Sequence, residues 1–309
     1  MHPEQTAKLP NGIEIAYDTC GDPADPAVLL IMGLGGPLNW WDADLCAMIA
    51  SRGFHVIRYD NRDVGRSTKL RSLGGTRAGI VHAYLRPTTV PPYTISDLAA
   101  DAAGLLDHLG IASAHVTGAS MGGMIAQTLA IERPERVLSL VSIMSTPGGR
   151  FVGWQDPRLF PLLLRRSDLS REAVIERSVK TWSIIGSPDY PTPDEETRHR
   201  AAETFERGMS PSGVVRQMQA VLSQPNRAAA LAQITAPTLV IHGLADRLVH
   251  VSGGRATARA IPGAELVLVP GMGHDLPREL WPVFVDGIER TAARASAATD
   301  RDRVVGEIG

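Results

Sequence analysis

The sequence predicts an α/β fold in which helices cover both faces of a mostly parallel central sheet. Short runs of β-branched and apolar residues recur with few polar interruptions, which is typical of strands buried on both sides. Helical patterns follow several of these runs, and strands that alternate with helices favour a parallel sheet. The runs that we interpret as strands are VLLIMG (28–33), HVIRYD (55–60), AHVTGA (114–119), VLSLVSIM (137–144), TLVIHG (238–243) and ELVLVP (265–270).

Two further segments add to this expected framework. The stretch NGIEIAY (11–17) is interpreted as an antiparallel edge strand. The clearest helix follows Thr94, which can cap the first turn together with Asp97 at the third position. Gly110 is expected to end this helix. Its apolar face consists of Leu98, Leu105, Leu106 and Leu109.

The alternation of strands and helices stops between about Pro147 and Arg227, where only helical patterns occur. One of these helices is expected to begin with Thr192 as its cap, Pro193 in the first turn and Glu195 placed for a capping box. The stretch is too long for a simple crossover between two strands. We therefore expect an inserted helical cap.

The chain is thus expected to have three parts. Residues 1–146 and 228–292 form the α/β core, and residues 147–227 form the helical cap. The tail of residues 293–309 is polar and rich in alanine, and we expect it to be partly disordered.

Composition and charge exclude several classes of function. The 309 residues carry a net charge of −2, whereas proteins that bind nucleic acid or anionic membranes favour basic surfaces. No apolar run approaches the roughly 20 residues that span a bilayer, and no secretory signal is recognised at the N-terminus. Cys20 and Cys46 are too few for a disulfide framework or a metal cluster. We expect a cytoplasmic protein without metal or cofactor, in an oligomeric state that the sequence leaves open.

A G-x-S-x-G motif stands where a predicted strand meets a predicted helix, in HVTGASMGGMIAQ (115–127). Its serine, Ser120, lies between Gly118 and Gly122. On such a turn the serine stands clear of the sheet in a strained backbone conformation. The flanking glycines lack a Cβ, which lets strand and helix pass closely. In this context the motif indicates a nucleophile.

A serine hydroxyl needs a base to accept its proton. His274 follows the last predicted strand in the loop VPGMGHDLP, at the sheet edge where Ser120 is expected. His115 and His242 lie inside predicted strands and are interpreted as satisfied sheet residues. The other candidates start a strand, lie on a helix or lie in the cap: His55, His108 and His199.

The base in turn needs a carboxylate to orient it. Asp246 follows the preceding predicted strand, whereas Asp60 and Asp63 follow a strand but precede the serine. The loop SIMSTPGG, after the strand that follows the nucleophile, contains no carboxylate. The resulting order of Ser120, Asp246 and His274 is the one expected of serine hydrolases with this motif.

The tetrahedral intermediate formed by a serine nucleophile carries an oxyanion, which needs preorganised hydrogen-bond donors. We expect one donor to be the backbone N–H of Met121, at the start of the helix after the serine, where the helix dipole favours negative charge. The other is expected from the loop IMGLGGP, in which Leu34 lies between two glycines.

The chain resembles the α/β-hydrolase superfamily in five blocks, which with their spacing cover most of residues 10–290. The blocks are LLIMGLGGP, RYDNRDVGRST, HVTGASMGGMIAQ, PTLVIHGLADRLV and VPGMGHDLP. In its motifs it most resembles the aclacinomycin methylesterase-like bacterial carboxylesterases. Many relatives have a histidine where this chain has Met32, a difference that leaves the neighbouring backbone donor in place.

The resemblance implies hydrolysis of a carboxylic ester, without saying which ester. It also implies a role for five residues. Ser120, Asp246 and His274 would form the triad, and Leu34 and Met121 would donate to the oxyanion.

The segment RYDNRDVGRS carries several charges close together. They could clamp a substrate, but charges this dense usually satisfy one another, and we favour a buried network of ion pairs that braces the loop. The residues are Arg58, Asp60, Arg62, Asp63 and Arg66.

Tryptophans are candidates for the wall of an apolar pocket over Ser120, which would suit acyl chains or bulky apolar alcohols. They are Trp40, Trp41, Trp154 and Trp182.

The leading hypothesis is a serine carboxylesterase that cleaves small to medium apolar esters through an acyl-enzyme. Carbon–carbon hydrolases, cofactor-free perhydrolases and interfacial lipases share the same triad and stay open. A ligand-binding receptor or inactive relative is the alternative from another class. Dehalogenases and epoxide hydrolases use an aspartate nucleophile, so a serine at this position argues against both.

Overall fold

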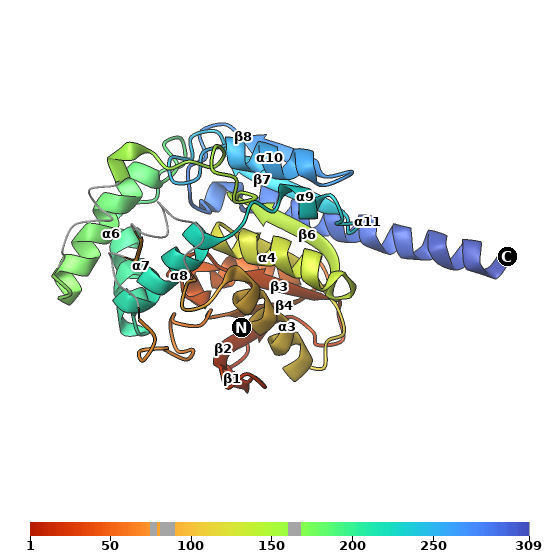
Figure 1. Ribbon diagram of the computed structural model, residues 1–309, viewed down its shortest axis with the longest axis horizontal. Helices are drawn as coiled ribbons and strands as arrows, with labels where there is room; N and C mark the ends of the chain where they lie inside the picture. The colour runs from red at the N-terminus through yellow and green to blue at the C-terminus, as the bar shows by residue number, and fades with distance from the viewer. Residues whose placement is uncertain (75–78, 81–89, 160–167, 309) are drawn as a thin grey trace.

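The chain folds around one mostly parallel sheet with helices on both faces, as the sequence predicts (Figure 1). The structure, a computed structural model, describes residues 1–74, 79–80, 90–159 and 168–308. Within these residues, eight strands lie in the order β1-β2-β4-β3-β5-β6-β7-β8. They are β1 (Gln5–Lys8), β2 (Glu14–Cys20), β3 (Ala27–Ile31), β4 (His55–Tyr59), β5 (Ala114–Ala119), β6 (Val137–Ile143), β7 (Thr238–Gly243) and β8 (Glu265–Val269).

The last six strands in this order, from β4 to β8, are all parallel to one another. Their carboxyl ends therefore meet at one edge of the sheet.

The antiparallel strand predicted near the start is present as β2, but the prediction that it lies at the edge of the sheet is wrong. The outermost strand is β1, which pairs with β2 from Gln5 opposite Tyr17 to Lys8 opposite Glu14. A strand of four residues is too short to produce a clear alternating pattern in the sequence.

Helices follow the strands and cover both faces of the sheet (Figure 1). They are α1 (Ala43–Ala50), α3 (Ile95–His108), α4 (Met121–Glu132), α6 (Arg171–Ile185), α7 (Asp194–Glu206), α8 (Pro211–Ser223), α9 (Ala228–Leu231), α10 (Ser252–Ala260) and α11 (Trp281–Ile308).

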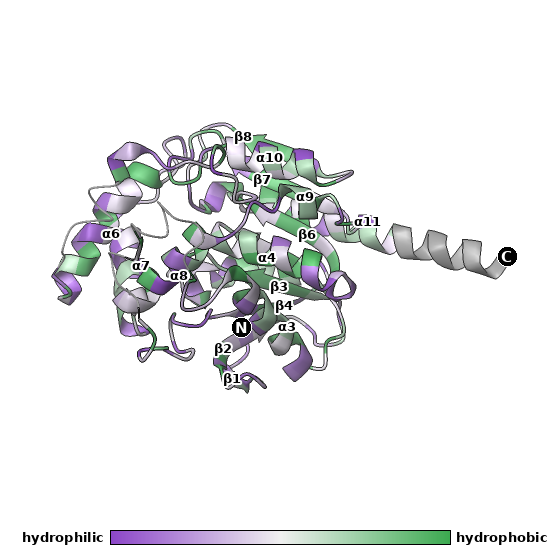
Figure 2. Cartoon of the chain, in the orientation of Figure 1, coloured by the Kyte–Doolittle hydropathy of each residue, from purple (hydrophilic) through white to green (hydrophobic). Residues whose placement is uncertain are grey.

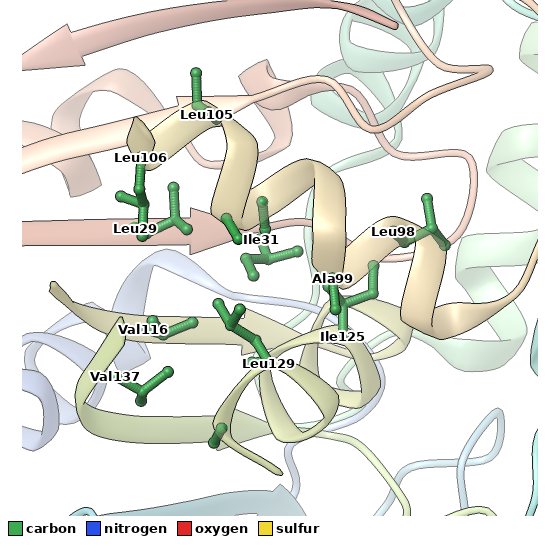
Figure 3. Packing of buried hydrophobic residues seen from close by; sticks show 14 of the residues in the cluster. Leu29, Ile31, Leu98, Ala99, Leu105, Leu106, Val116, Ile125, Leu129 and Val137 are labelled. Carbon is green, nitrogen blue, oxygen red and sulfur yellow. The ribbon is translucent and has the colours of Figure 1, made fainter. Parts of the chain in front are cut away.

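Alternate residues of the central strands supply the two halves of the core. On β3, Leu29 and Ile31 pack with α3 and α4 on one face, and Val28 and Leu30 pack with α1 and α11 on the other. Each of these four side chains is fully buried. Figure 3 shows Leu29 and Ile31 between the side chains of α3 and those of β5 and α4. Figure 2 shows the same concentration of hydrophobic residues in the central strands.

The capping predicted for α3 is confirmed. The Thr94 hydroxyl accepts a hydrogen bond from the Asp97 N–H, and the Asp97 carboxylate accepts one from the Thr94 N–H. The helix ends at His108, and Gly110 adopts a φ of +69° just beyond it. A left-handed backbone at this position favours glycine.

Helices α6, α7 and α8 lie between β6 and β7 in the chain and gather at one side of the molecule (Figure 1). The capping predicted for α7 is wrong: the helix begins at Asp194, and Pro193 precedes it without a side-chain cap. Three acidic residues in the first turn, from Asp194 to Glu196, instead complement the helix dipole. Another helical pattern of this stretch, DPRLFPLLLRR (156–166), lies partly outside the described residues.

The division into core, cap and tail stays a prediction. Helix α11 extends away from the sheet and includes most of the alanine-rich tail, whose partial disorder also stays a prediction (Figure 1).

The charged segment 58–66 forms ion pairs, but with partners elsewhere in the chain and not within the segment. Two of these partners, Arg207 and Arg216, lie on or next to α7 and α8, so the pairs tie those helices to the strands. Arg216 is almost fully buried, and its guanidinium lowers the pKa of Asp63 against the opposing effect of burial. The pairs are Arg58–Asp18, Arg62–Asp101, Arg66–Glu4, Asp60–Arg207 and Asp63–Arg216.

A buried histidine in the sheet makes stability depend on pH. Burial lowers the pKa of His115 to about 4, whereas an unfolded histidine has a pKa of about 6.5. Above pH 6.5 neither state binds the proton. As the pH falls from 6.5 towards 4, the unfolded state alone takes it up, so stability falls by up to about 1.4 kcal/mol per pH unit.

We therefore expect the free energy of unfolding of the native protein to fall more steeply between pH 7 and pH 4.5 than that of His115→Gln. The difference should reach roughly 2 kcal/mol in urea titrations. Parallel curves for the two proteins would contradict this account.

Candidate active site

Three loops bring Ser120, Asp246 and His274 together at the carboxyl edge of the sheet. Ser120 directly follows β5, Asp246 follows β7, and His274 follows β8. Because these strands are parallel neighbours in the order β5-β6-β7-β8, the loops after them lie on the same side. In open α/β sheets this edge is where ligands usually bind.

Ser120 occupies the tight turn between β5 and α4. Its φ of 57° and ψ of −120° lie in a region that residues with a Cβ rarely adopt. The flanking glycines have no room for a side chain: a Cβ on Gly118 would lie 2.1 Å from the Gly122 carbonyl oxygen, and one on Gly122 would lie 2.0 Å from that of Ile31. Hydrogen bonds from the Ser120 N–H to the Ile143 carbonyl and from the Ser145 hydroxyl to the Ser120 carbonyl hold the turn.

The three side chains form a continuous chain of hydrogen bonds. His274 Nε2 lies 2.9 Å from Ser120 Oγ, and His274 Nδ1 lies 2.8 Å from Asp246 Oδ2. His274 and Asp246 are buried, whereas Ser120 is partly exposed. A carboxylate accepts, so Nδ1 carries the proton of a neutral imidazole and Nε2 is free to accept from the serine hydroxyl.

Asp246 stays ionised in this setting. Burial alone would raise its pKa, but the adjacent His274 and His242 outweigh that effect and lower the pKa to about 2. Asp246 Oδ1 also accepts from the backbone N–H groups of Leu248 and Val249, at 2.9 and 2.8 Å. A fixed, charged acceptor therefore faces His274 at every pH near neutrality.

The loop of His274 is held from the end of α6, which the sequence did not reveal. The His274 N–H donates to the Ile185 carbonyl at 2.7 Å, and the Gly273 N–H donates to Ser187 Oγ at 2.8 Å. Ser187 also hydrogen-bonds Asp275, whose pKa is raised by burial. No sequence signal links these segments, because they are distant in the chain and meet only in the folded protein.

The loop after β3 lies beside Ser120, as the oxyanion role requires. A Cβ on Gly33 would lie 3.0 Å from the Ser120 Cβ. Among the described residues, no acceptor takes a hydrogen bond from the backbone N–H of Leu34 or of Met121. Both N–H groups therefore stay available for a ligand.

Two buried amides hold this loop. The Asn61 side chain donates to the Met32 carbonyl at 3.0 Å. Gln217 of α8 accepts from the Gly35 N–H at 2.8 Å and donates to the Arg62 carbonyl at 3.0 Å. Gln217 is fully buried, and its contribution was also missed from the sequence.

The four tryptophans are not brought together. Trp41 is buried in the core beside Leu45 of α1, and Trp154 is half exposed and stacks on the His250 ring at 4.2 Å. Trp40 and Trp182 do meet, with ring centres 5.5 Å apart and the edge of one ring against the face of the other.

A cavity of about 300 Å³ lies among the end of α6, the start of α7 and the loop that joins them. Trp182 and Asp275 contribute to its wall, whereas Ser120 and His274 do not. The Arg200 guanidinium, which also lines it, lies over the Trp182 ring at 4.7 Å. The cavity therefore borders the loop of His274 through Asp275, and Ser120 is not part of its wall.

Other features of the described residues bear on cofactors and membranes. Cys20 and Cys46 are both free thiols. In the part of the chain that the structure describes, no group of three or more His, Cys, Asp or Glu side chains is arranged to hold a metal ion. No helix among the described residues is both long and apolar enough to cross a membrane.

Comparison with known proteins identifies the family. A family model described as the alpha/beta hydrolase fold matches residues 26–277. The chain belongs to this family. Rhodomycin D methylesterase DauP from Streptomyces sp. (strain C5) is 31% identical over 285 residues, which cover 83% of this chain and 87% of the relative. Rhodomycin D methylesterase DnrP from Streptomyces peucetius is 30% identical over 283 residues, with the same coverage of 83% and 87%.

A solved structure agrees with the assignment. The enol-lactonase from Burkholderia xenovorans LB400 is 25% identical, with a TM-score of 0.67 over 96% of this chain and 98% of that one. The methylesterase relatives support ester hydrolysis as the class of activity of this alpha/beta hydrolase.

The close contact at the serine turn predicts that a methyl group added there destabilises the protein, whereas one added elsewhere does not. Gly122→Ala should destabilise the protein by about 3 kcal/mol or more, because its Cβ would overlap the Ile31 backbone, which cannot move without separating α4 from the sheet. Urea unfolding followed by circular dichroism measures the loss.

Gly104→Ala is the matched control. This glycine lies inside α3, and the three atoms nearest to a Cβ there would all belong to the Leu9 side chain, the first at 3.3 Å. Alanine there should leave stability unchanged or raise it by roughly 0.5–1 kcal/mol. Equal effects of the two substitutions would contradict the described packing.

Proposed function

We propose that this protein is a serine carboxylesterase in which Ser120, His274 and Asp246 act as nucleophile, base and acid. The observation that carries the proposal is the chain of hydrogen bonds from Ser120 Oγ through the His274 ring to Asp246 Oδ2. The strained turn that exposes the serine and the two free N–H groups beside it support the same roles.

In the first half of the reaction, Ser120 Oγ attacks the ester carbonyl carbon while His274 Nε2 takes the hydroxyl proton. Asp246 stabilises the imidazolium that forms. The carbonyl oxygen becomes an oxyanion, which accepts hydrogen bonds from the N–H groups of Leu34 and Met121. His274 then gives its proton to the departing alcohol oxygen, and an acyl-serine remains.

In the second half, water attacks the acyl-serine carbonyl while His274 Nε2 accepts a proton from it. The tetrahedral intermediate collapses, Ser120 recovers its proton, and the carboxylic acid leaves.

The substrates that we propose are small to medium apolar esters, with methyl esters among them. Two relatives of about 30% identity are named as methylesterases, which supports a small alcohol portion. Trp40, between β3 and α1, packs edge-to-face against Trp182 of α6. This aromatic contact between the 147–227 segment and the rest of the chain is the support for an apolar or aromatic acid portion.

The test is hydrolysis of a series of p-nitrophenyl esters from acetate to palmitate, together with methyl esters of aromatic acids. We expect the native protein to cleave members of the series and Ser120→Ala to lose kcat/KM by roughly 10⁴-fold or more. Ser142→Ala, which alters a buried serine hydrogen-bonded to Gln127, is the control and should keep full activity.

A native protein that is inert on every ester would overturn the carboxylesterase proposal. Cleavage of a β-diketone would then identify a carbon–carbon hydrolase, and peroxide-dependent halogenation would identify a perhydrolase. Tight ligand binding without turnover would identify a receptor built on this fold.

A further inference from the structure

His242 is a second histidine beside Asp246, and the proposed mechanism does not use it. It is fully buried on β7, four residues before Asp246. Its Nε2 lies 2.8 Å from the Val249 carbonyl oxygen and 3.4 Å from Asp246 Oδ2. A carbonyl oxygen only accepts, so His242 Nε2 carries the hydrogen. This N–H therefore lies beside the carboxylate oxygen that also accepts from His274.

The His242 ring is confined on its other side. Among the described residues its Nδ1 has no hydrogen-bond partner. Helix α10 packs against this edge, and a Cβ on Gly254 would lie only 2.5 Å from Nδ1. The ring is thus fixed between α10 and the Asp246 turn.

Both backbone groups of Val249 form hydrogen bonds that hold the turn containing Asp246. The Val249 N–H donates to Asp246 Oδ1, and the Val249 carbonyl accepts from His242. Without the hydrogen bond from His242, the Val249 carbonyl is no longer held, and the turn that orients the Asp246 carboxylate can move. A shift of about 1 Å at a catalytic group can lower the rate by roughly 100-fold.

We propose that His242 is a positioning residue, which fixes the Asp246 carboxylate so that Oδ2 faces His274. It acts through Asp246 and touches no substrate. This inference rests on the proposed function, because it assigns a role within the same triad.

The test compares three variants on an ester that the native protein cleaves. His242→Leu removes the N–H donor and should lower kcat by about 10- to 100-fold with KM within twofold of native. His242→Gln keeps an N–H donor at about the distance of His Nε2 from Cβ, on a more flexible side chain, and should recover most of that loss. His115→Leu is the matched control: it alters another buried sheet histidine, which bonds Ser139 and not the triad, and should leave kcat near native.

A second measurement does not depend on turnover. Proton NMR detects the downfield resonance of the proton between His274 Nδ1 and Asp246. We expect it in the native protein and in His115→Leu, and we expect it shifted or broadened away in His242→Leu. If the native protein cleaves no ester, the proposed function fails while this resonance still tests His242.

Gly254→Ala provides an independent perturbation if His242→Leu does not fold, because its methyl group pushes on the His242 ring. It should reproduce the fall in kcat and the change of the resonance. A kcat and a resonance in His242→Leu equal to those of His115→Leu would overturn the proposal, as would an unchanged resonance in Gly254→Ala.

Discussion

The arrangement of the site depends on how closely α4 passes the ends of β3 and β5. Gly118 and Gly122 leave no space for a methyl group, and Ser120 between them adopts a left-handed φ of 57°. Backbone strain of this kind costs about 1–3 kcal/mol and persists only where the surroundings enforce it. Here the Ile143 carbonyl and the Ser145 hydroxyl do so. The strained turn lifts Ser120 Oγ off the sheet, to within 2.9 Å of His274.

The helices between β6 and β7 also hold the site together. Gln217 of α8 bonds the loop that contains Leu34, and the segment after α6 bonds the loop that contains His274. Buried ion pairs from Arg207 and Arg216 fasten the same helices to the strands. Breaking one member of such a buried pair leaves an uncompensated charge, which is strongly destabilising. These helices therefore hold two sides of the proposed site.

Much of the fold and of the candidate site could be predicted from the sequence. The buried parallel strands are continuous apolar runs, and the Thr94 cap is a local pattern, so both are readable along the chain. Ser120, Asp246 and His274 could be selected because parallel strands place the loops that follow them at one edge. In the structure the His274 ring lies within hydrogen-bond distance of both Ser120 and Asp246.

Contacts between distant segments could not be predicted in the same way. The end of α6 meets the loop of His274, and Gln217 in the middle of α8 meets the loop of Leu34, only through tertiary packing, which leaves no periodic or spacing signal. The ion-pair partners of residues 58–66 could not be predicted for the same reason, because each pair joins positions far apart in the chain. The tryptophans were chosen by residue type alone, and only Trp40 and Trp182 meet.

The central claim is that His274 activates Ser120 as a nucleophile. Covalent labelling by a fluorophosphonate, followed by intact mass and peptide mapping, tests it most directly because the label captures an activated serine without any substrate choice. The account predicts a single adduct on Ser120 in the native protein, and labelling slowed by orders of magnitude in His274→Ala. Labelling of a different serine, or labelling of Ser120 at the same rate without His274, would contradict it.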